Sequence, residues 1–291
     1  MSKVLSEESW KIAEKFIELL DPKPTTIISV LKLLCADGLK ICSRTSLSAV
    51  ERLRGSETFK TSFAAFEETY QQILAGKNSL SWQNLRAVDV AGIILAVYAY
   101  GKIKSLIKAE DLAYILPRLS LEIDLGFAIS LGLPGLDCLS GAITSIGRFF
   151  ALALIYTQDT KWFTEYRRIL RSMRFQSDHN YEVEKFGCTL EQIFSACSLA
   201  LGISSERLEG YVTSATFSLD QAPSTHSEYR FWISRRWNFS YIETRKIPSM
   251  EHKLDYYPPT ELVEPFVKTL ETIADNHQGF SLWLEKGDQN N

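Results

Sequence analysis

The amino-acid sequence predicts an all-α protein. Apolar residues recur at three- and four-residue spacings along most of the chain up to about residue 216, which is the period of an amphipathic helix. Alternating apolar and polar positions, the pattern of a half-buried strand, are rare, and clusters of turn-forming residues are few. The chain has 291 residues, of which 45% are hydrophobic, so it is long enough to bury a large core in one domain or in two small ones.

We expect the chain to have three parts that differ in their residue pattern. They are an N-terminal helical arm (residues 1–22), a helical domain (23–216), and an aromatic and basic segment followed by a C-terminal amphipathic helix (217–291). The arm is a helix that starts at Ser6, a residue type that caps helix N-termini, and stops before Pro22. Periodic apolar residues then predict helices at 26–41, 46–53 and 57–75.

The middle of the helical domain is the most apolar part of the chain. The run Val88–Tyr100 is too short to cross a bilayer core, which takes roughly 20 apolar residues, so we expect it to lie in a buried helix over 82–108. A helix is also expected over 110–131, broken or kinked at Pro117 because proline lacks the amide hydrogen that a helix interior needs. After a loop that contains glycine and proline, a further helix is expected over 136–156.

After residue 156 the sequence predicts helices, a polar connection and one segment whose conformation stays open. Helices are expected at 160–173, 190–201 and 205–216, with a polar connection at 178–180. If the segment 229–246 is helical, Thr225 and Glu228 just before it would form a capping box. Its partly alternating aromatic residues would instead suit a strand, so the conformation of this segment stays open. A final helix is expected over 260–286, with an apolar face suited to its own core or to a partner.

Composition excludes several classes of protein. A formal net charge of −3 gives no overall electrostatic attraction to nucleic acid. The five cysteines are odd in number and include no C-x-x-C pair, so neither a disulfide framework nor a zinc ribbon is expected. Glu7, Glu8 and Glu14 interrupt the apolar positions of the first segment, unlike the core of a secretory signal. We therefore expect reduced thiols in a cytoplasmic protein that does not engage a membrane.

The stretch Gly141–Phe149, GAITSIGRF, carries a family resemblance. It resembles the metal-binding helix of HD-domain phosphohydrolases, in which adjacent His and Asp residues hold a catalytic metal within a run such as GLLHDIGR. Thr144 and Ser145 stand at those two positions in this chain. Neutral hydroxyl groups bind divalent cations poorly without carboxylate or imidazole ligands beside them. The resemblance therefore implies a degenerate HD position that has lost its metal ligands.

Further stretches are similar to the HDOD family, whose domains look like HD domains without their catalytic residues. Phe186–Ile193 (FGCTLEQI) and Leu199–Ile203 (LALGI) follow in the family's order, and Pro24–Leu34 is similar to the helix that opens these domains. The resemblance is clearest over Ser120–Tyr211. It implies an HD/HDOD-like helical bundle with a C-terminal extension, acting in bacterial signal transduction or regulation without catalysis.

Catalytic motifs are absent from the sequence. A serine or threonine nucleophile needs a positioned base, and neither a G-x-S-x-G elbow nor a suitably spaced histidine accompanies Thr144 and Ser145. Their hydroxyl groups are expected to bond back to the preceding helical turn. Glycine-rich phosphate loops are also missing. The histidines are expected at solvated or core-edge positions: His179, His226, His252 and His277. We predict no catalytic residue, no metal ligand and no cofactor.

The basic aromatic segment 229–246 is the strongest candidate for a binding surface. Its candidate contact residues are Arg230, Trp232, Arg235, Arg236 and Trp237. Tryptophan and arginine dominate the hot spots of protein interfaces, which favours a protein partner. The same residue types bind single-stranded nucleic acid when arginines neutralise phosphates and aromatic rings stack on bases. Packing within the chain is the third interpretation, because arginine stems cover apolar surface while aromatic rings fill it.

These observations predict a non-catalytic bacterial signalling or regulatory scaffold that binds a partner protein through an HDOD-like domain. One alternative is a degenerate HD-type phosphohydrolase acting on a nucleotide or phosphodiester, with its metal held by residues that no motif reveals. Another is a nucleic-acid-binding adaptor that uses residues 229–246. The sequence leaves open the identity of the partner, the oligomeric state, and whether the helical core binds a small ligand.

Overall fold

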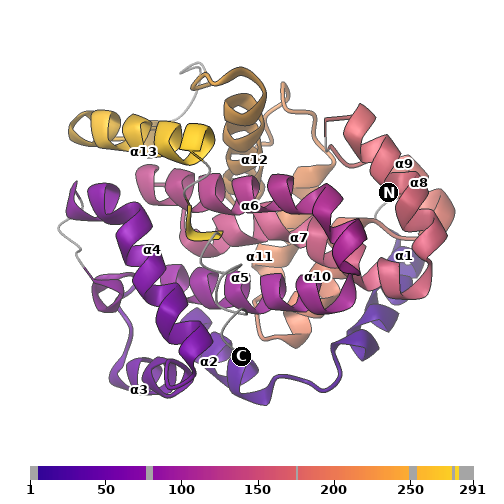
Figure 1. Cartoon of the computed structure of the whole chain (residues 1–291), viewed down its shortest axis with the longest axis horizontal. Helices are drawn as coiled ribbons and strands as arrows, with labels where there is room; N and C mark the ends of the chain where they lie inside the picture. Colours follow the sequence, from indigo (N-terminus) through magenta and orange to yellow (C-terminus); the bar gives the residue numbers. More distant parts are fainter. Residues whose placement is uncertain (1–5, 77–80, 175, 249–253, 277–278, 282–291) are drawn as a thin grey trace.

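The structure, a computed structural model, describes residues 6–76, 81–174, 176–248, 254–276 and 279–281. It is 79% helical, with thirteen α-helices and no β-strand among these residues, so the all-α prediction is confirmed (Figure 1). The helices gather around a central group of three, which run side by side across the middle of Figure 1: α5 (Ala87–Leu106), α6 (Ala109–Gly132) and α7 (Cys138–Gln158).

Four described α-helices precede this central group in the chain. They are α1 (Glu7–Glu14), which continues into a 3₁₀ turn (Lys15–Leu20), then α2 (Thr25–Asp37), α3 (Arg44–Leu53) and α4 (Glu57–Gly76). The predicted N-terminal arm does not stand apart from the domain. Its Ala13 and Leu20 are buried in the main core, and the Ser9 hydroxyl accepts a hydrogen bond of 2.9 Å from Gln192 Nε2 on the helix beneath it.

Helix α7 is the centre of the core. Every one of its residues from Cys138 to Tyr156 is buried except Arg148. The predicted burial of the run Val88–Tyr100 is also confirmed, because most of α5 is buried against α7. Of the described helices, α7 is the one whose length and composition would allow it to cross a membrane, but 94% of its apolar window lies inside the fold.

The helix predicted over 110–131 is present, and it is not broken at Pro117, because α6 runs from Ala109 to Gly132. Proline removes the amide that would bond the carbonyl of Ala113, four residues earlier. Both Pro117 and Ala113 are exposed, so water can replace the missing donor without leaving a buried carbonyl unpaired.

Small residues allow the central helices to approach closely. A Cβ atom on Gly141 of α7 would lie 2.6 Å from the carbonyl oxygen of Gly126 on α6, and it would overlap the hydroxyl of Ser130. On the other side of α7, a Cβ atom on Gly92 of α5 would overlap the backbone of Cys138. The absence of side chains at these positions brings the three backbones into contact.

The second half of the chain adds four helices around α7: α8 (Thr160–Ser172), α9 (His179–Phe186), α10 (Leu190–Ala200) and α11 (Ser205–Ala215). The residues predicted to form a polar connection, 178–180, instead form the start of helix α9. Asp178 is its N-cap, accepting a hydrogen bond of 3.1 Å from the Tyr181 amide, so the polar residues mark a helix start. A capping box formed by Thr189 and Gln192 begins α10 close to its predicted position.

The basic aromatic segment is helical. It forms α12 (His226–Thr244), and the Thr225 hydroxyl accepts a hydrogen bond of 3.3 Å from the Glu228 amide. The last described helix, α13 (Val263–Asn276), follows a 3₁₀ turn at Thr260–Leu262. Part of the helix predicted over 260–286, at 277–278 and 282–286, lies outside the described residues.

The predicted C-terminal extension shares the core of the domain. Phe280 packs against Phe66 and Phe127, with ring centroids 5.8 and 5.6 Å away. The amide of Ser281 donates a hydrogen bond of 2.8 Å to the buried carboxylate of Asp124. One hydrophobic core therefore contains residues from all three predicted parts of the chain.

The N-terminus of α7 is held by the buried residue Asp137. Its carboxylate accepts hydrogen bonds of 2.8 Å from both the Ser140 amide and Arg207 Nη1, and it lies 3.5 Å from Arg230 Nη1. Burial alone would raise the pKa of Asp137, but Arg207 and the Ser140 amide lower it below its usual 3.8. This carboxylate thereby ties α11 and α12 to the start of α7.

Replacing Gly141 by alanine should destabilise the fold, because the added methyl group would meet backbone atoms of α6. We expect the free energy of unfolding to fall by about 3 kcal/mol in urea denaturation. Gly101→Ala is the matched control. It also replaces a helical glycine, but nothing lies within 4 Å of the added atom, so helix propensity predicts a gain of about 1 kcal/mol. Equal effects of the two substitutions would contradict the close contact between α6 and α7.

Asp137→Asn keeps a capping oxygen and removes the charge that Arg207 and Arg230 face. We expect it to lower the free energy of unfolding by about 3 kcal/mol at neutral pH. A carboxyl group whose pKa is lowered by folding stabilises the protein above its unfolded pKa, and this contribution is lost as the pH falls through the folded pKa. The difference between wild type and variant should thus shrink as the pH falls below 3.8. A difference that stays constant in urea denaturation from pH 7 to about pH 3 would rule out this role of the charge.

Candidate functional site

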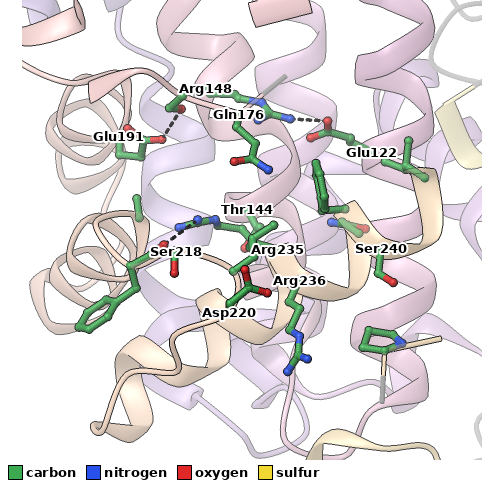
Figure 2. Close-up of a pocket in the computed structure, with 18 of the residues that line it drawn as sticks. Glu122, Thr144, Arg148, Gln176, Glu191, Ser218, Asp220, Arg235, Arg236 and Ser240 are labelled. Carbon is green, nitrogen blue, oxygen red and sulfur yellow. Dashed lines mark hydrogen bonds and ion pairs between the residues drawn. The ribbon is translucent and has the colours of Figure 1, made fainter. Parts of the chain in front are cut away.

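A cavity of about 860 Å³ lies between the central helices and α12 (Figure 2). Its wall is formed by α6, α7, α10, α11 and α12, with the segment that leads into α9. Thr144, from the stretch that resembles the HD metal helix, is one of its lining residues, whereas Ser145 is fully buried outside it. The cavity therefore adjoins the stretch in which the sequence resembles an HD metal helix.

The cavity wall carries more positive than negative groups. Its described cationic side chains, leaving aside His179, are Arg118, Arg148, Arg235, Arg236 and Lys246. Its described carboxylates are Glu122, Glu191 and Asp220. Clefts lined by charges of one sign concentrate the electric field between low-dielectric walls and attract ligands of the opposite sign. The cavity is thus suited to an anion.

Two of the arginines share one carboxylate. Arg118 Nε donates a hydrogen bond of 2.6 Å to Glu122 Oε1, and Arg148 Nη2 pairs with the same oxygen (Figure 2). Arg118 Nη1 also reaches Glu243 at 3.2 Å. These pairs hold the arginines of α6 and α7 at the edge of the cavity, and the Gln176 side chain extends into the cavity beside Arg148 (Figure 2).

Arg235 is held differently, by backbone carbonyl groups. Its Nη1 donates to the carbonyl of Ser214 at 2.9 Å and its Nη2 to that of Phe217 at 3.4 Å, at the C-terminal end of α11. Within the described part of the chain, no carboxylate pairs with it. Burial lowers the pKa of Arg235, and the charge of Glu191 partly offsets this effect. A guanidinium nevertheless stays charged at neutral pH, so Arg235 brings a positive charge without a directly bound counterion.

The five predicted contact residues do not lie together on one surface. Trp232 and Trp237 are buried and so are not surface contact residues, which corrects the sequence-based prediction. Trp232 Nε1 donates to the carbonyl of Ser218 at 2.8 Å, and the Trp237 ring packs 5.7 Å from Phe266. Packing within the chain, the third interpretation, accounts for both residues.

The three arginines of that set have different positions. Arg230 lies 3.5 Å from Asp137 and belongs to the capping cluster of α7. Arg236 stacks over the Trp232 ring, 5.3 Å from its centroid, and lines the cavity together with Arg235. The candidate binding residues that reach the cavity are therefore the two arginines in the middle of α12.

The hydroxyl groups of Thr144 and Ser145 are both hydrogen-bonded within the fold. Thr144 Oγ1 donates a hydrogen bond of 2.8 Å to the carbonyl of Ser140, one turn earlier, which confirms the predicted back-bond. Ser145 Oγ instead accepts a hydrogen bond of 3.4 Å from Asn238 Nδ2 on α12.

A histidine and two glutamates meet at one edge of the cavity. His179 begins α9, Glu182 lies one turn later, and Glu191 lies in the first turn of α10. His179 Nε2 and Glu191 Oε2 are 3.2 Å apart. Glu182 accepts hydrogen bonds from the Tyr166 hydroxyl and, at 3.0 Å, from the Leu190 amide. His179 and Glu191 also line the cavity.

These three groups change one another's protonation. Burial opposes a charge on His179, but the Glu191 carboxylate beside it raises the pKa of His179 to about 9. Burial and the charge of Glu191 both raise the pKa of Glu182. Despite its own burial, Glu191 has a lowered pKa because His179 faces it and Ser177 donates a hydrogen bond to it.

Local patterns in the sequence do not predict this cluster. The spacing His179-x-x-Glu182 puts both side chains on one face of a helix, but that signal requires α9 to be recognised. Of the other histidines, His226 is hydrogen-bonded to the Tyr256 hydroxyl at 2.7 Å, and His252 and His277 lie outside the described residues.

The fold and the cavity together define an all-α protein with a positively charged internal pocket. Comparison of the chain with models of known families, with curated proteins and with solved structures finds no match. The HDOD resemblance stays a prediction that rests on the short motifs around Thr144 and Phe186. The cavity is therefore the feature of the fold that bears on function.

Proposed function

We propose that this chain is a non-catalytic regulatory protein that binds a small phosphorylated ligand in its cationic cavity and signals occupancy to a protein partner. The observation that carries the proposal is Arg235, a largely enclosed guanidinium at the cavity wall whose hydrogen bonds go to carbonyl groups. A buried cation is costly unless an anion compensates it. A bound phosphate would supply that compensation.

The chemistry of the wall suits a phosphate group. Arginine presents a planar fork of donors that matches phosphate oxygens, and Arg236 and Arg148 lie at the same cavity as Arg235. Thr144 and Ser218 add polar groups for the neutral part of a ligand. At about 860 Å³ the cavity has room for a molecule the size of a nucleotide.

The position of Arg235 and Arg236 suggests how occupancy would reach a partner. Both lie on α12, whose Trp237 packs against Phe266 of α13. A ligand that draws the two guanidinium groups towards it would bias the placement of α12, and with it the contact to α13. This role agrees with the signalling function that the HDOD resemblance implies, in a bacterial and cytoplasmic setting.

The alternative of a degenerate HD-type phosphohydrolase is favoured by one observation, the cluster of His179, Glu182 and Glu191 at the cavity edge. Such an enzyme would hydrolyse a phosphoester bound by the same arginines. The nucleic-acid alternative loses its stacking residues, because Trp232 and Trp237 are buried and cannot stack on bases.

Isothermal titration with inorganic phosphate, pyrophosphate and the common ribonucleoside mono- and diphosphates tests the proposal. We expect at least one of these anions to bind stoichiometrically, and Arg235→Met to weaken its binding by about tenfold to a hundredfold, because a charge-assisted hydrogen bond is lost. The same compounds incubated with the protein and analysed for released phosphate distinguish binding from hydrolysis.

Arg168→Met is the matched control, since Arg168 is an exposed arginine on α8 that does not line the cavity. The Arg168→Met variant should bind the anion with the same affinity as wild type. If Arg235→Met disturbs folding in circular dichroism, Arg236→Met takes its place. Binding that is absent for every anion, or that is unchanged in the cavity variants, would contradict the proposal.

A further inference from the structure

We propose that His179, Glu182 and Glu191 bind one divalent transition-metal ion, Zn²⁺ or Mn²⁺, at the edge of the cationic cavity. One ligand atom from each residue lies within 4.8 Å of the other two. Ligands about 2.1 Å from a shared tetrahedral ion lie roughly 3.4 Å from each other. Small side-chain rotations therefore bring the three atoms to coordination distance.

His179 and Glu191 form a buried ion pair that a metal ion would replace. His179 Nε2 lies 3.2 Å from Glu191 Oε2, and both atoms are enclosed without a hydrogen bond of good geometry. The Glu191 side chain is only 7% exposed, so water contributes little to its solvation. A divalent cation between these two atoms would displace the proton of His179 and bond to both.

The surrounding groups support the carboxylates in the way that a metal centre requires. The Ser177 hydroxyl donates to Glu191 Oε1 at 2.9 Å, so Oε2 is the oxygen of this carboxylate that faces His179. The Tyr166 hydroxyl and the Leu190 amide donate to the two oxygens of Glu182. Such outer hydrogen bonds orient metal-binding carboxylates and contribute to metal affinity.

The ligand types limit the choice of ion. One imidazole and two carboxylates suit Zn²⁺ or Mn²⁺, whereas Mg²⁺ and Ca²⁺ favour sites made of oxygen alone. Three protein ligands also leave a coordination position open. Because His179 and Glu191 line the cavity, the ion has a path of entry, and the open position lies next to the space proposed for an anion.

The metal site does not depend on the proposed anion binding. Arg235 and Arg236 attract an anion whether or not an ion is bound, and the three ligands bind an ion without a phosphate. The two proposals are therefore tested with different probes, the metal alone in one case and the anions alone in the other.

The full-length untagged chain, freed of metal with a chelator and then dialysed, is titrated with Zn²⁺ and separately with Mn²⁺. Bound metal is measured by mass spectrometry of the elements after gel filtration. We expect one equivalent of at least one ion to bind at micromolar concentration or below. His179→Gln and Glu191→Gln should each weaken binding at least tenfold, because each removes a ligand.

Glu184→Gln is the matched control, since Glu184 is an exposed residue of the same helix, and it should bind metal like wild type. If the ligand variants fail to fold, Tyr166→Phe tests the proposal in their place. It keeps all three ligands and removes the hydrogen bond from the Tyr166 hydroxyl to Glu182. We expect about tenfold weaker binding in it. Absence of stoichiometric metal in wild type would overturn the proposal, as would equal affinity in the ligand variants or in Tyr166→Phe.

Discussion

Enclosure of α7 by the other helices holds the fold together. An apolar helix of this length is stable in water only when neighbours cover it on all sides. The close approach at Gly141 and Gly126 brings α6 against α7, and Gly92 does the same for α5. These contacts fix the positions of the three central backbones, and the outer helices pack on the frame that they form.

The candidate site is a consequence of the same arrangement. Arg148 is the one residue of α7 between Cys138 and Tyr156 that is not buried, and it reaches the cavity. Helices α6 and α12 supply the other arginines that line the cavity. Protein of low dielectric constant surrounds much of the cavity, so its charges interact strongly with one another and with any ligand. The cavity, like the Asp137 cluster at the start of α7, brings charged groups into a largely apolar fold.

The helices could largely be predicted from the sequence, because local signals mark them. Apolar periodicity predicted α2 to α8, α10 and α11, and the capping residue Ser6 marked the start of the first helix. Helix α9 was missed because it is short and opens with polar residues at Asp178–Asn180. The path of α6 through Pro117 depends on the exposure of Ala113, which no local pattern reveals.

The candidate site could be predicted only in part. The sequence singled out Arg235 and Arg236, but it placed them on a surface together with Trp232 and Trp237 because aromatic and basic residues occur at interfaces and in cores alike. It also singled out Thr144 without showing that a cavity adjoins it. The cluster of His179 and Glu191 joins two helices, so only the tertiary structure brings these residues together.

The proposed role of Arg235 is to bind a phosphate group in the cavity beside Thr144. Crystals of the chain grown with tungstate, a phosphate analogue that scatters strongly, test this role directly in an anomalous difference map. We expect a tungstate ion inside the cavity, within hydrogen-bond distance of the Arg235 guanidinium. Tungstate bound only at the molecular surface, with the cavity free of it, would contradict this role of Arg235.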